Sequence, residues 1–214
     1  MIVRLQNNQV SFCIQVSNRG AQMALKKAAE VKSFTAPSLW QSWLAKNHAS
    51  SEGVWLRFFK KESGRKSLSH DEALDEALCY GWIDGQLARY DEISWLQKFS
   101  PRRPKGKWSK RNREHVARLT TENRMKAAGL REVESAKSDG RWEQAYDSPK
   151  NMKMPEDFLK ELRKNKKAFA FFGTLNKANT YAIGWRLQTA AKPETRERRM
   201  KQILKMMSER KKFH

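Results

Sequence analysis

Seven basic residues with no acid among them lie between positions 102 and 113, and their types suit anion binding. They are Arg102, Arg103, Lys105, Lys107, Lys110, Arg111 and Arg113. Arginine binds phosphate or carboxylate through two parallel hydrogen bonds, and Trp108 within the tract can stack on a base or on another arginine. Pro101 and Pro104 reduce the entropy of the unfolded chain, which favours an ordered loop. The tract therefore predicts contact with a small anion or a polyanion.

Two features next to the tract extend this prediction. Ser109 is placed to cap a helix that runs to about Glu122, and the free N–H groups and dipole of a helix start attract anions. Asp84 follows a helix end and precedes a strand, where a carboxylate can act as a general base or pair with an arginine. The interpretation that we favour is a structural pair between Asp84 and Arg102 or Arg103.

A predicted hairpin between residues 83 and 100 returns the chain to the point that it left. Side chains near both of its ends should therefore form one binding site. The predicted members are Trp82, Asp84, Arg102, Arg103, Lys105, Trp108, Ser109 and Asn112. The alternative is a structural staple in which Trp108 belongs to the core and the arginines only pair with carboxylates.

No catalytic set is recognisable. His48, His70, His115 and His214 lie in four separate elements, and none has the spacing of metal-binding histidines. His70 and Cys79 are nine residues apart on one predicted helix, too far for a nucleophile and its base. There is no glycine-rich phosphate loop, nucleophile elbow or dinucleotide fingerprint. We therefore predict no catalytic residue, metal or cofactor, and whether the protein is an enzyme stays open.

Composition indicates a folded, strongly basic protein. Eight Trp, ten Phe and an apolar fraction of 39% argue against disorder. The formal charge of +21 favours an anionic ligand, an acidic protein or nucleic acid, although solvated surface charge would look the same. Cys13 and Cys79 form no disulfide framework, and no apolar run is long enough for a membrane span. These features predict a cytoplasmic protein without a membrane span, of unknown oligomeric state.

The periodicity predicts an α+β fold in which helices pack on a small antiparallel three-stranded sheet. The strands are expected at 53–60, 83–90 and 93–100. A helix at about 70–80 begins with a capping box of Ser69 and Glu72, and Cys79 on it reads as an inert core thiol. Further helices are expected from Pro37, at 109–122 and at 130–137, with Gly129 separating the last two.

The chain beyond residue 150 is wholly helical in pattern, with helices expected at 155–164, 167–172, 177–190 and 193–211. We therefore predict an extension at 1–31 with a hairpin, a core domain at 32–149 and a helical region at 150–214. Met23 offers a second start, so residues 1–22 need not belong to the native protein. The last helix carries many cations, which read either as an anion-binding surface or as a solvated face.

Several uncommon tracts follow one another along the chain. They are Gly53–Leu56, Glu72–Gly85, Pro101–Lys105 with Trp108, Ser109 and Asn112, Asp139–Trp142 with Ala145 and Tyr146, and Ala191–Arg196 with Arg199. With these tracts in this order, the chain resembles the YdeI/OmpD-associated family, also called bacteriocin-protection proteins, over about residues 34–207. Departures from that family are His70, where tyrosine is usual, Gly106, where serine is usual, and Asn123, where glycine is usual.

The resemblance implies bacteriocin tolerance or an envelope link, and it brings no catalytic residues. The leading hypothesis is a non-enzymatic binding or stress-protection protein with a basic anion-binding site. One alternative is a nucleic-acid-binding protein that uses Arg102 to Arg113 and the last helix. Another is an uncharacterised enzyme acting on an anionic metabolite around Asp84, Arg103 and Trp108, which a deep pocket lined by those three side chains would favour.

Overall fold

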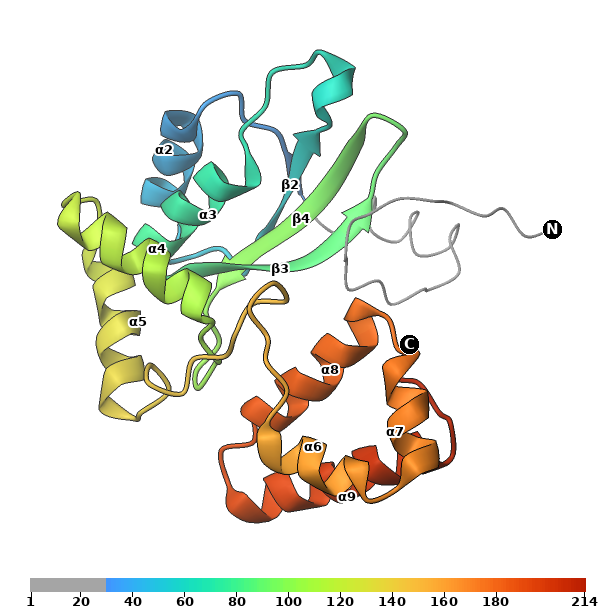
Figure 1. The fold of residues 1–214 in the computed structure, drawn as a ribbon. Coiled ribbons are helices and arrows are strands. Elements are labelled where there is room, and N and C mark those ends of the chain that lie inside the picture. Colours follow the sequence, from blue (N-terminus) through green and yellow to red (C-terminus); the bar gives the residue numbers. More distant parts are fainter. Residues whose placement is uncertain (1–29) are drawn as a thin grey trace. The chain divides into compact units, whose positions relative to one another are not determined.

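The computed structural model describes residues 30–214, which form two compact units (Figure 1). The α/β unit contains residues 30–106 and 112–142, and the helical unit contains residues 107–111 and 143–214. The basic tract thus passes from one unit to the other and back. The predicted N-terminal hairpin lies outside the described residues.

The sheet of the α/β unit has four strands in the order β1-β2-β4-β3. They are β1 (Val31–Lys32), β2 (Val54–Phe59), β3 (Trp82–Arg89) and β4 (Ser94–Pro101). The three predicted antiparallel strands are present, because β4 pairs antiparallel with both β2 and β3. The prediction of a purely antiparallel three-stranded sheet is wrong, because β1 adds a parallel partner to β2. A strand of two residues is too short to show an alternating pattern, so only its pairing with β2 reveals it.

Helices α2 (Pro37–Asn47) and α3 (His70–Cys79) supply much of the core of this unit. The predicted capping box of α3 is confirmed, with Ser69 and Glu72 satisfying each other's backbone N–H groups. The apolar residues of α3 are buried together with apolar residues of α2, β2, β3 and β4. The larger members are Trp40, Leu44, Leu56, Phe58, Leu74, Leu78, Trp82 and Phe99.

Helices α4 (Lys110–Thr121) and α5 (Ala127–Ser138) follow the sheet. Gly129 lies inside α5 and does not separate the helices as the sequence suggests. The reason is close packing, because a β-carbon at Gly129 would lie 2.4 Å from the backbone oxygen of Cys79. Glycine is therefore required here for the approach of α5 to the end of α3.

A network of charges also connects α3 with α4 and the turn that follows it. The buried Asp75 accepts hydrogen bonds from His115 at 2.6 Å and from Arg118 at 2.5 Å. The buried Glu76 pairs with Arg124 at 2.6 Å. Each carboxylate is held by partners on a second element, so the network stabilises the packing of this unit.

The helical unit contains α6 (Glu156–Arg163), α7 (Lys166–Gly173), α8 (Lys177–Gln188) and α9 (Pro193–Ser208). The four predicted helices are thus present; α6, α8 and α9 are shorter than predicted, and α7 is one residue longer at each end. Asparagines cap α7 and α8, as Asn165 accepts from Ala168 N–H and Asn176 from Asn179 N–H. Their apolar faces form one core of Phe158, Leu162, Ala168, Ile183, Leu187, Ile203 and Met207.

Candidate anion-binding turn

The first half of the basic tract forms a tight turn directly after β4. Strand pairing places Pro101 opposite Trp82, and the Arg102 N–H then donates to the Gly81 oxygen at 3.0 Å. This confirms the prediction that the two ends of the hairpin are neighbours. Arg102 is only 8% exposed, so it anchors the start of the turn and does not face solvent.

Residues 103–106 close the turn, because the Gly106 N–H donates to the Arg103 oxygen at 2.9 Å. Pro104 occupies the second position, and Lys105 has a left-handed backbone with φ of 61°. Proline followed by a left-handed residue is the pattern of a type II turn, which normally has glycine or asparagine where Lys105 stands. A left-handed backbone at lysine lowers the stability of the fold by roughly 1–2 kcal/mol. Backbone conformation alone would therefore favour glycine at this position, yet the chain has a positively charged residue there.

Arg141 fixes the turn from the end of α5. Its Nη1 donates to the Gly106 oxygen at 2.9 Å, and its Nε lies 2.7 Å from Asp139 Oδ2. The hydrogen bond from Arg141 lowers the pKa of Asp139, and the charge of Lys105 contributes further. Arg141 is not among the predicted site residues, although it lies in the Asp139–Trp142 tract that carries the family resemblance.

Arg103 and Lys105 are left as the cations that the turn presents to solvent. Within residues 30–214, neither has a carboxylate within ion-pair distance, whereas Arg141 is neutralised by Asp139. Their backbone is held by hydrogen bonds on both sides. The turn is therefore a preorganised pair of positive charges, which can bind an anion with little ordering cost.

Asp84 has a different partner from the predicted arginine. Its Oδ2 lies 3.2 Å from His70 Nε2, and the His70 Nδ1 lies 3.5 Å from Asp71 Oδ1. The strand register pairs Asp84 with Phe99, two positions along the ladder from the pair of Trp82 and Pro101. The prediction of an Asp84–arginine pair is therefore wrong, because the first residue of α3 reaches the carboxylate.

Two other predicted site residues, Trp82 and Asn112, are buried in the fold. The Trp82 ring is 1% exposed, and its Nε1 donates to the His48 oxygen at 3.1 Å. Asn112, on the first turns of α4, is 9% exposed. Neither offers a surface for a ligand at the turn.

The second half of the tract belongs to the helical unit. Trp108 is 2% exposed, which fits the alternative in which it is a core residue. Ser109 forms a short parallel bridge with Tyr146 and precedes α4, which begins at Lys110. Of the eight predicted site residues, Trp108 and Ser109 thus fall in the helical unit and the other six in the α/β unit.

The lysines of this half bind groups of the helical unit. Lys107 Nζ donates to the Thr189 oxygen at the end of α8, where cations complement the helix dipole. Burial, and then the charge of Arg199, lowers the pKa of Lys107. Lys110 lies 2.8 Å from Asp147, whose backbone and side chain also bond Gln188. Burial acts to raise the pKa of Asp147, but the hydrogen bonds from Lys110 and Gln188 lower it overall.

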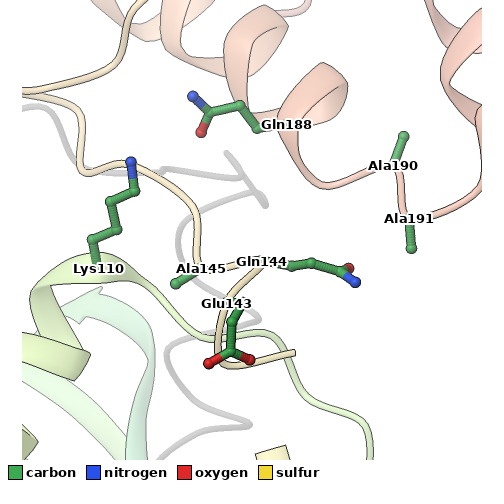
Figure 2. Close-up of a pocket in the computed structure, with 7 residues that line it drawn as sticks. All are labelled: Lys110, Glu143, Gln144, Ala145, Gln188, Ala190 and Ala191. Atoms are coloured by element: carbon green, nitrogen blue, oxygen red, sulfur yellow. The ribbon is translucent and has the colours of Figure 1, made fainter. Parts of the chain in front are cut away.

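An open hollow of about 370 Å³ lies beside these groups (Figure 2). Lys110 and Gln188, which line it, are already bound to Asp147. None of the eight predicted site residues lines it, so it is a separate feature. Its lining is Lys110, Glu143, Gln144, Ala145, Gln188, Ala190 and Ala191.

Metal-binding clusters and membrane-spanning helices are both absent from residues 30–214. No group of three or more His, Cys, Asp or Glu side chains in this range is placed to hold a metal ion. No helix in this range has the length and apolarity needed to cross a membrane.

The fold and the turn define a basic α+β protein with a separate helical unit. Residues 151–210 match the family described as "Bacteriocin-protection, YdeI or OmpD-Associated", which confirms for this region the family predicted from the sequence. Residues 32–132 match a domain of unknown function, DUF8412. No curated protein and no solved structure matches the chain.

Proposed function

We propose that this is a non-enzymatic binding protein of the bacteriocin-protection type, which acts in the cytoplasm and holds an anionic ligand or an acidic protein segment on the turn at residues 103–106. The observation that carries the proposal is Lys105, a solvent-facing cation in a left-handed conformation on a rigid turn. Backbone strain of this kind persists where surrounding structure supports it, and it concentrates at functional sites. Arg103 beside it supplies a planar cation that suits carboxylate or phosphate.

The family match of residues 151–210 supports the protective role. A deep pocket lined by Asp84, Arg103 and Trp108 would favour the enzyme alternative. Asp84 is instead engaged by His70, and Trp108 is a buried residue of the other unit. Binding therefore fits these residues better than catalysis.

The test is a binding measurement on the full chain with inorganic pyrophosphate and a polyglutamate peptide as probes. The double variant Arg103→Ala/Lys105→Ala should lose at least tenfold in affinity while its melting temperature stays near that of the wild type. The matched control is Lys61→Ala/Lys66→Ala, which removes the same charge from another exposed loop of the α/β unit. Equal loss in both double variants would show that only net charge matters, and it would refute a site at the turn.

The Lys105→Gly variant should weaken anion binding without lowering the stability of the fold. Glycine adopts positive φ at no steric cost, so the variant should be at least as stable as the wild type. It should nevertheless bind the probes more weakly, since the charge is gone. A variant that keeps full affinity would remove Lys105 from the site. Protection of cells against a bacteriocin should fall in parallel with affinity in the double variant.

A further inference from the structure

Helix α7 presents a phenylalanine to solvent that the core does not need. Phe169 is 43% exposed, whereas Phe171 and Phe172 of the same helix pack against the apolar core. Phe172 also makes an edge contact with Phe158, with ring centroids 5.9 Å apart. The apolar face of α7 is thus complete without Phe169.

The exposed ring of Phe169 has open space one turn after it on the helix. Helical spacing places Lys166, Phe172 and Gly173 next to Phe169, and Phe172 packs against the core. Gly173 is exposed, and a β-carbon added there would meet nothing within 4 Å. The ring is therefore open on the side of Gly173, where a flat group can stack on it.

Two lysines beside the ring stand where the helix itself disfavours them. Lys166 and Lys167 open α7, at the positive end of its dipole, and the first turn contains no acid. Both are exposed, and no carboxylate of residues 30–214 lies within ion-pair distance of either. The cations just before them differ, because Arg163 pairs with Glu156 and Lys164 with Glu161. Lys166 and Lys167 are thus positioned for an anion from outside.

We infer that the exposed face of α7 binds single-stranded nucleic acid, with a base stacked on Phe169 and the adjacent phosphates on Lys166 and Lys167. An accessible ring beside unpaired cations is the combination that single-strand binders use. A duplex keeps its bases stacked and offers no free base face. A single exposed ring offers too little apolar area to insert into a lipid surface.

This location differs from the nucleic-acid surface expected from the sequence, which included the last helix. In α9, Arg196 pairs with Asp157 and Lys201 with Glu197, and Arg199 donates to the Arg186 oxygen. These cations already serve the fold. The inference rests on α7 alone and is independent of the turn at residues 103–106.

Fluorescence anisotropy of the full chain with a labelled 15-nucleotide oligo(dT), over a salt series from 50 mM upward, tests the inference. Phe169→Leu should weaken binding about tenfold without changing the salt slope, because it removes stacking. Phe169→Tyr should bind like the wild type. Lys166→Gln/Lys167→Gln should reduce the slope of log affinity against log salt by about 1.4, which is the value for two phosphate contacts on a single strand.

The matched control is Lys61→Gln/Lys66→Gln, which lowers the net charge by the same two units as Lys166→Gln/Lys167→Gln. This control should leave the slope of log affinity against log salt unchanged. Melting curves should show every variant folded, with Lys166→Gln/Lys167→Gln at least as stable as the wild type. The inference is overturned by absence of binding at 50 mM salt, by equal affinity for a duplex of the same length, or by Phe169→Leu binding as tightly as the wild type. Binding to phosphatidylglycerol vesicles that depends on Phe169, without binding to the oligonucleotide, would overturn it in favour of a membrane surface.

Discussion

Gly129→Ala should destabilise the α/β unit, because α5 approaches the end of α3 too closely for any side chain. The new β-carbon would lie 2.4 Å from the Cys79 oxygen and 2.6 Å from the Leu78 oxygen. A carbon and an oxygen normally approach to about 3.3 Å, so the helix would have to move by roughly 0.9 Å. The Cys79 oxygen also accepts from the Lys126 N–H at 3.1 Å, and that bond would stretch.

The expected loss in the free energy of unfolding combines two destabilising contributions and one stabilising contribution. Overpacking costs about 1–3 kcal/mol, and a weakened hydrogen bond costs roughly 0.5–1.5 kcal/mol. Alanine returns up to about 1 kcal/mol through its better helix propensity. The net loss in the free energy of unfolding should therefore be about 2 kcal/mol, which corresponds to a fall in melting temperature of roughly 8 °C or more for a unit of this size.

Urea unfolding followed by tryptophan fluorescence measures this effect, since six of the eight tryptophans belong to the α/β unit. Gly173→Ala in α7 is the matched control, because its β-carbon enters open space. That change should leave the melting temperature unchanged or raise it. A Gly129→Ala variant as stable as the wild type would show that α5 does not pack against α3 as closely as these distances indicate.

The remaining predictions concern a helix end, a buried thiol and a partly buried carboxylate. Asn123 has φ of 54° in a Schellman motif that ends α4, so Asn123→Gly should be neutral or stabilising and Asn123→Ala should cost about 1 kcal/mol in thermal unfolding. Burial above all raises the pKa of Cys79 to about 12, so in a Cys13→Ser background a thiol reagent at pH 8 should label the protein only at its unfolding rate; rapid labelling would contradict the burial. The pKa of Asp147 is lowered in the folded state, so its contribution is present above the unfolded value of about 3.9 and is lost as pH falls through the folded value. The stability difference between wild type and Asp147→Asn should thus be present at pH 7 and shrink below about pH 4, and a constant difference would show that the charge is irrelevant.

Local signals accounted for most of the secondary structure. The Ser69–Glu72 capping box, the alternating runs of the hairpin and the helical periodicity after residue 150 are encoded within short windows. The structure contains the corresponding elements. The departures have physical causes outside such windows. Strand β1 exists only through its pairing with β2, and Gly129 reads as a helix breaker until its contact with α3 is known.

For the candidate site, the sequence by itself determined that a rigid, proline-bounded and strongly basic segment follows a hairpin, because charge, proline and turn chemistry are properties of neighbouring residues. Tertiary structure alone decided which of its cations remain available. In the folded chain, Lys107 binds the end of α8 and Trp108 is buried. Asp84 pairs with His70. The fold also brings Arg141 under the turn, leaving Arg103 and Lys105 exposed. A side chain's partner depends on which distant residue the fold brings within a few ångströms, and no local pattern carries that information.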